Sequence, residues 1–170
     1  ELLILINLEN MKNLVILGAG TAGTMMANHL VKKLNKKEWQ ITLVDQFKSH
    51  YYQPGFLFIP FGTYQPEDVK RTIDEFLPKG IQLIREKIDR IDKDTDTVIL
   101  ENGRNVKYDI LIIATGCKIA PEEVPGMKGD TWQKNIFDFY TFEGSCALAK
   151  KLETWPGGKL VVHITEMPIK

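Results

Sequence analysis

The sequence predicts an α/β domain in which a parallel sheet carries an inserted antiparallel β-ribbon. Three observations predict it. The glycines Gly18, Gly20 and Gly23 separate an apolar run from a helix-like stretch, and a second apolar run ends in Asp45. Turn-forming residues then divide short β-prone segments before a third apolar run at residues 110–113. Strands that alternate with a helix are typical of a parallel sheet.

The first part of the chain predicts a βαβ unit. Residues 13–17 are mostly apolar and predict a strand, and apolar residues recur at helical spacing over about 21–34. Residues 41–44 predict the second strand. The crossover between two such parallel strands should be right-handed.

The glycines between the first strand and the helix have separate predicted roles. Gly18 permits a tight turn, Gly20 lets the backbone approach a pyrophosphate, and Gly23 lets helix and strand pack closely. The helix N-terminus offers unpaired N–H groups to phosphates. Asp45 can accept hydrogen bonds from a ribose diol. This spacing predicts a dinucleotide site, because a glycine-rich turn in another α/β protein would not explain the acid.

The segment 46–65 is irregular and aromatic, and Pro54 and Pro60 interrupt regular structure there. Its aromatic residues are Phe47, Tyr51, Tyr52, Phe56, Phe58, Phe61 and Tyr64. Two interpretations stay open. The loop walls a flat ring system or a quinone, or it forms a hydrophobic plug over the sheet.

The middle of the chain predicts a helix and then a ribbon. Residues 66–77 predict the helix, because Pro66 suits a first helical turn and apolar residues recur at helical spacing. Strands are predicted over residues 81–91, 97–100 and 106–113. They predict an antiparallel ribbon that leads into a fully buried strand at 110–113. A helix at 141–154 and a turn and strand at 157–163 follow.

Composition predicts one folded domain with a sizeable core. The chain has 170 residues, of which 44% are hydrophobic and 26% charged, and its net charge is zero. The balance of charge gives no reason to expect nucleic acid as a partner. The apolar runs are too short to cross a bilayer. Residues 1–10 lack the features of a signal peptide and are interpreted as an N-terminal extension before Met11.

The glycine triplet, Asp45, the ribbon and the run from Tyr108 to Gly116 resemble the FAD-binding part of the two-dinucleotide-domain flavoproteins, the pyridine nucleotide–disulfide oxidoreductase superfamily. That family includes type II NADH dehydrogenases and sulfide:quinone oxidoreductases. The resemblance covers nearly the whole chain after Met11. It implies a Rossmann-like FAD-binding domain over residues 11–154 and the truncated start of a second nucleotide-fold-like domain over residues 155–170.

The resemblance implies FAD as the cofactor and assigns residues to it. The residues implied to hold the pyrophosphate are Gly18, Gly20, Ala22 and Gly23. The implied ribose ligand is Asp45, and the implied backbone contacts to adenine are Lys87 and Ile88. The residues implied to pass close to the dinucleotide are Thr115 and Gly116. The residues implied to lie near the ribityl or ring end are Gln53 and Pro54.

The end of the chain distinguishes subfamilies. Members that use NAD(P)H have a second glycine-rich loop after the strand predicted here at 157–163, but residues 164–170 contain no glycine and include Pro168. This departure favours the sulfide:quinone oxidoreductase group. That resemblance implies sulfide as donor, a quinone as acceptor and two electrons passing through FAD. It also implies a C-terminal region that would attach an otherwise cytoplasmic protein peripherally to a membrane, and a homo-oligomer stays open.

Two other functions stay open. One is a flavin-dependent NAD(P)H reductase, and the other is a dinucleotide-binding module without turnover. Cys117 directly follows Gly116 and is the candidate catalytic residue, either as a reactive thiol near FAD or as a flavin attachment point. The alternative is a small buried hydrophobic residue. Cys146 is interpreted as helix packing. No spacing predicts a metal site, and His50 has no catalytic partner that the sequence identifies.

Overall fold

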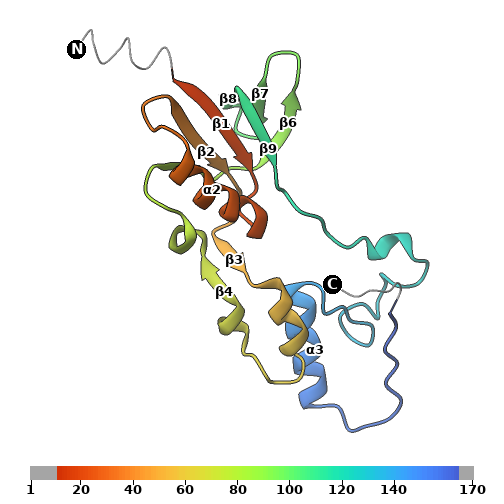
Figure 1. The fold of residues 1–170 in the computed structure, drawn as a ribbon. Coiled ribbons are helices and arrows are strands. Elements are labelled where there is room, and N and C mark those ends of the chain that lie inside the picture. The colour runs from red at the N-terminus through yellow and green to blue at the C-terminus, as the bar shows by residue number, and fades with distance from the viewer. Residues whose placement is uncertain (1–10, 165–170) are drawn as a thin grey trace.

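A four-stranded parallel sheet forms the core of the part of the fold that carries helix α2 (Thr21–Lys33), away from helix α3 (Phe142–Glu153) (Figure 1). A computed structural model describes residues 11–164, so the extension expected at residues 1–10 lies outside the described residues. The sheet has the order β5-β2-β1-β9. Its strands are β1 (Lys12–Leu17), β2 (Trp39–Val44), β5 (Ile81–Ile84) and β9 (Ile110–Ile113). This confirms the α/β class and the three predicted parallel strands, and it adds β5, which pairs with β2.

Helix α2 (Thr21–Lys33) and the β-ribbon cover opposite faces of the sheet. Side chains alternate across a strand, so successive residues of β1 enter different cores. Leu14 and Ile16 pack on the α2 side with Ala27. Val15 and Leu17 pack on the ribbon side. The sheet is therefore the middle layer of three, and its carboxyl edge carries the glycine-rich loop.

The inserted ribbon consists of three antiparallel strands, β6 (Ile88–Asp92), β7 (Thr97–Leu100) and β8 (Asn105–Lys107). Its presence confirms the sequence prediction, but its boundaries correct it. The strand predicted over residues 81–91 is two strands, because the chain leaves the parallel sheet after β5 and enters the ribbon at β6. In the same way β8 and β9 are separate.

The helix predicted over residues 66–77 is absent. The segment forms two short 3-10 turns, η2 (Pro66–Val69) and η3 (Ile73–Phe76), around strand β4 (Lys70–Thr72). β4 pairs with β3 (Ser49–Tyr51) in a small antiparallel sheet. The buried Val69 and Ile73 belong to different hydrophobic clusters, so they cannot share one helix face.

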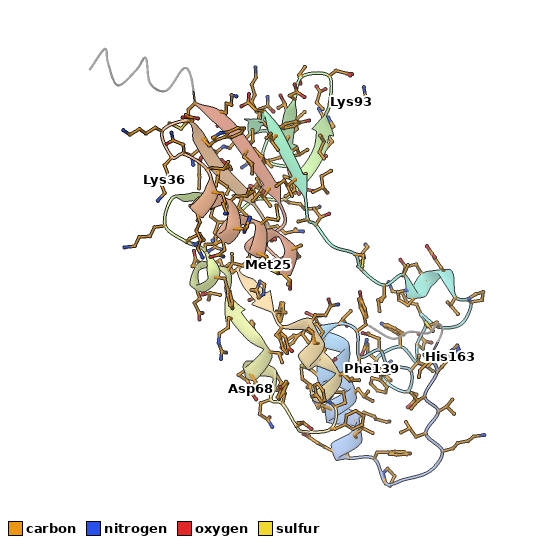
Figure 2. The ribbon with its side chains drawn as sticks, in the orientation of Figure 1. Met25, Lys36, Asp68, Lys93, Phe139 and His163 are labelled. Atoms are coloured by element: carbon orange, nitrogen blue, oxygen red, sulfur yellow. The ribbon has the colours of Figure 1, made fainter. Side chains whose placement is uncertain are left out.

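A second, smaller cluster lies at the far end of the β3–β4 pair, around α3 (Phe142–Glu153) and η1 (Gln53–Phe58). Phe56, Ile59 and Val69 are buried against α3. The Thr141 hydroxyl accepts a hydrogen bond from Gly144 N at 3.0 Å and caps α3, which confirms the predicted helix. Figure 2 shows Phe139 beside this cluster and Met25 on α2.

Two further expectations are wrong. β9 was expected to be fully buried, but Ile110 is 44% exposed and Ile113 is 64% exposed, because β9 is an edge strand within residues 11–164. The strand expected at residues 157–163 does not form, and Val161 is 72% exposed. Residues 165–170 lie outside the described part. The helices within residues 11–164 include none that is long and apolar enough to cross a membrane.

Candidate functional site

Two of the loop glycines are required by the fold itself. Gly18 has a φ of +96°, and a Cβ there would overlap the carbonyl oxygen of Ala114. A Cβ on Gly23 would overlap the carbonyl oxygen of Gly18. The turn therefore packs tightly against the end of β9 on one side and against α2 on the other.

Gly20 differs from both. It is the N-cap of α2, has an ordinary φ of −70°, and has no atom within 4 Å of the position a Cβ would take. The described fold therefore leaves room for a side chain at Gly20. Ala22, the second residue of α2, is also exposed. The N–H groups at the start of a helix lack intrahelical acceptors, so this open surface presents hydrogen-bond donors.

Asp45 lies beside this loop, at the end of β2. Its Oδ2 accepts a hydrogen bond from Ala19 N at 2.6 Å, and its Oδ1 accepts one from Phe47 N at 2.7 Å. The carboxylate thus holds the loop, a role that the sequence did not predict. Each carboxylate oxygen can accept more than one hydrogen bond, so Asp45 keeps acceptor capacity for a ribose diol.

Lys87 and Ile88 enter the ribbon next to the same edge. Asp45 N donates to Ile84 O at 3.0 Å, so β5 leaves the sheet beside Asp45. Both backbone groups of Lys87 have protein partners: its N–H donates to Glu86 Oε1 at 2.9 Å, and its C=O accepts from Glu101 N at 3.0 Å. The side-chain hydrogen bond to Glu101 raises the pKa of Lys87.

Thr115 and Gly116 pass directly over the loop. Ala114 N donates to Leu17 O at 2.8 Å, and a Cβ on Gly18 would lie 2.9 Å from Thr115 Cα. Thr115 and Gly116 are both exposed. The structure therefore brings residues from the ends of β1, β2 and β9 to one edge, where ligands bind in parallel α/β sheets.

Cys117 and Gln53 meet at a residue that the sequence did not single out, Tyr140. The Cys117 Sγ lies 3.6 Å from the Tyr140 hydroxyl oxygen. The hydrogen bond with Cys117 is the largest effect on Tyr140 and raises its pKa. The Gln53 side chain also interacts with this hydroxyl and lowers its pKa. Cys117 is exposed, which rules out the buried hydrophobic interpretation in this structure. Pro54, next to Gln53, is exposed as well.

Cys146 has a structural environment. It lies on α3, packs against the cluster of Phe56, Ile59 and Val69, and burial raises the pKa of its thiol. A thiol of this kind reacts slowly. The packing interpretation of Cys146 is confirmed.

The aromatic residues of segment 46–65 do not all have the same environment. Neither interpretation, a wall for a flat ring or a plug over the sheet, describes all of them. Phe56 is buried, but it packs against α3 and not over the main sheet. Phe47 and Phe61 are 62% and 70% exposed. Among residues 11–164, no three His, Cys, Asp or Glu side chains are grouped to hold a metal ion.

The parallel sheet and the glycine-rich loop are those of a Rossmann-like nucleotide-binding fold. The comparison with protein families identifies the family within this class. A family model described as pyridine nucleotide-disulphide oxidoreductase matches residues 12–162. The chain belongs to this family of oxidoreductases.

Similar proteins narrow the comparison. The sulfide-quinone reductase of Aquifex aeolicus is 32% identical over 143 residues, which cover 84% of this chain and 31% of that protein. Its sulfide:quinone oxidoreductase crystal structure superposes with a TM-score of 0.68 at 29% identity, covering 84% of this chain and 32% of that one. A type II NADH:quinone oxidoreductase of Staphylococcus aureus is 29% identical, over 74% of this chain and 31% of that protein. The chain thus spans about a third of the length of these relatives.

Proposed function

We propose that this chain binds FAD at the loop of Gly18, Gly20 and Gly23 and forms part of a flavin-dependent oxidoreductase. The observation that carries the proposal is Gly20. The fold has room for a side chain there, yet the position is bare and lies at the N-terminus of α2. A glycine at this point is what a pyrophosphate needs for close approach.

The residues around the loop fit the rest of such a cofactor. The free N–H groups at the start of α2 would bind the pyrophosphate. Asp45 would accept from the adenosine ribose through its remaining lone pairs. Thr115 and Gly116 would border the dinucleotide where they cross the loop. Adenine contact through the backbone of Lys87 would require its N–H and C=O groups to exchange their present partners. The backbone of Ile88 is the other candidate for this contact.

Gln53, Pro54 and Cys117 would lie toward the ring end of the cofactor. The proximity of both Gln53 and Cys117 to Tyr140 supports this assignment. FAD supplies the two-electron chemistry when it is bound, and the protein supplies binding and orientation. Cys117 is the candidate catalytic residue, because its exposed thiol would lie near the ring of the cofactor.

We further propose sulfide as the electron donor and a quinone as the acceptor. The relatives named sulfide:quinone oxidoreductase, in Aquifex aeolicus and Dictyostelium discoideum, support it. Peripheral membrane attachment, a homo-oligomer and a second domain beginning near residue 155 stay predictions for the whole protein.

A second candidate is an NAD(P)H-dependent flavin reductase. The Staphylococcus aureus relative named type II NADH:quinone oxidoreductase favours it, with 29% identity. Quinone is the acceptor in both names, so the two candidates differ in the donor.

The experiment is anaerobic reduction of the full-length protein, followed by its visible flavin absorbance. Sulfide is expected to bleach the flavin, NADH is not, and a soluble quinone is expected to restore the colour. Rapid bleaching by NADH would transfer the protein to the reductase class. A flavin inert to both donors would leave a dinucleotide-binding module without turnover.

A further inference from the structure

His50 contacts the glycine-rich loop from the small β3–β4 sheet. Its Nδ1 lies 3.1 Å from the carbonyl oxygen of Ala19. A carbonyl oxygen can only accept, so Nδ1 carries the hydrogen in this contact. The ring is held against Phe76, with ring centroids 4.6 Å apart and planes inclined at 42°. Its backbone is fixed by pairing with Arg71 on β4.

With this contact, both backbone groups of Ala19 are hydrogen-bonded to side chains. Its N–H donates to Asp45, and its C=O accepts from His50. Its side chain is also buried, with 1% exposed. Ala19 therefore has its position and both adjacent peptide planes fixed by side chains from outside the loop.

Because the peptide bond is planar, the fixed carbonyl of Ala19 also sets the direction of the Gly20 N–H. The carbonyl of Ala19 and the N–H of Gly20 belong to one trans peptide unit, so they point in opposite directions. Holding the Ala19 oxygen toward His50 directs the Gly20 N–H away from His50. The N–H groups of the first turn of α2 have no intrahelical acceptors and are available to the same ligand as the Gly20 N–H.

We propose that His50 is a positioning residue of the pyrophosphate site, one that orients the Gly20 N–H before the ligand arrives. The inference rests on the proposed dinucleotide function and deepens it. A donor fixed in advance does not have to be ordered when the ligand binds, so affinity rises without a new contact. His50 does not touch the ligand itself. Its effect should therefore appear only for ligands that carry the pyrophosphate.

The test compares ADP with adenosine, by calorimetry on the full-length protein freed of its flavin. His50→Leu removes the ring donor. It is expected to weaken ADP binding about threefold to tenfold, the effect of one hydrogen bond, and to leave adenosine binding unchanged. His50→Asn keeps an N–H near the position of Nδ1 and is expected to restore most of the affinity. His29→Leu, at an exposed histidine on α2, is the matched control and should change neither.

The outcomes separate this inference from the proposed function. Wild-type protein that binds neither ADP nor FAD would overturn both. Wild-type binding with an unchanged His50→Leu variant, or with equal losses for ADP and adenosine, would overturn the role of His50 alone. If His50→Leu does not fold by circular dichroism, His50→Asn is compared with His50→Gln, whose amide lies nearer the position of Nε2. Equal ADP affinity of these two variants would also overturn the role.

Discussion

The thiol of Cys117 lies 3.6 Å from the hydroxyl oxygen of Tyr140, across 23 residues of sequence. The hydrogen bond raises the pKa of Tyr140, while Gln53 acts in the opposite direction. Removing the thiol removes the largest contribution that raises this pKa, while the contribution of Gln53, which lowers it, remains. Cys117→Ala should therefore lower the pKa of Tyr140. A pH titration of tyrosinate absorbance in the near ultraviolet measures it, with Tyr140→Phe subtracted to isolate this tyrosine. A Tyr140 titration that does not move would contradict the contact.

Cys117→Ser tests whether this cluster reaches the flavin. Cys117 is exposed, so the substitution should change the free energy of unfolding by no more than about 0.5 kcal/mol. We expect an altered flavin spectrum or altered flavin attachment in the full-length protein. Visible spectroscopy before and after denaturation reports both. Identical spectra and attachment in wild type and variant would remove Cys117 from the flavin environment.

Gly18 and Gly20 should respond differently to the same small change. Gly18→Ala places a Cβ against the Ala114 carbonyl at a φ of +96°, so it should destabilise the fold by at least about 1–3 kcal/mol. Gly20→Ala meets open space and should cost less than about 1 kcal/mol, the usual size of an N-cap effect. Denaturant unfolding measures the difference. Equal losses would mean that the loop does not pack against β9 as described.

Asp45 should contribute to stability as well as to ligand binding. Asp45→Asn keeps one carbonyl acceptor and loses the other, so one of the bonds from Ala19 and Phe47 is lost. A hydrogen bond to a charged group contributes about 1.5–3 kcal/mol, and the free energy of unfolding should fall by that order. Asp45→Ala loses both bonds and should fall further. Thermal unfolding without flavin measures this. Unchanged stability in both variants would leave Asp45 with a ligand role only.

The sequence predicted the βαβ unit and the ribbon because their signals are local. Alternating burial in β1 follows from strand geometry, and the Gly18 turn needs a positive φ that glycine supplies. A strand was predicted at residues 81–84, but its membership of the parallel sheet as β5 was missed, because its pairing with β2 is a tertiary contact. Nothing in residues 81–84 marks which sheet they join.

The failed helix at residues 66–77 shows the limit of periodicity. Val69 and Ile73 are four residues apart, which fits a helix face, but each enters a different hydrophobic cluster. Two capped turns serve both clusters: Gln65 N donates to Asp68 at 2.8 Å, and Thr72 N donates to Glu75 at 3.0 Å. The spacing of apolar residues therefore predicts which residues are buried, but it does not predict which part of the protein each of them packs against.

The unformed strand at residues 157–163 and the exposed β9 have one physical cause. A strand needs a partner for its backbone groups, and apolar residues alone do not provide one. Val161 has no such partner within residues 11–164, and Ile113 lies at the open edge of the sheet. The Tyr140 contact with Cys117 was equally beyond the sequence, because it depends on the path of the intervening loop.

The most direct test of the dinucleotide site is the flavin content of the full-length Gly20→Val protein. A Cβ at this position meets no atom within 4 Å, and a β-branched residue suits the extended backbone of the N-cap, so the fold should persist by circular dichroism. Gly129→Val is the matched control, since Gly129 also has open space around it and lies outside the loop. The account predicts that wild type and Gly129→Val purify with bound flavin, and that folded Gly20→Val purifies without it. The same flavin-to-protein ratio in all three proteins would contradict it.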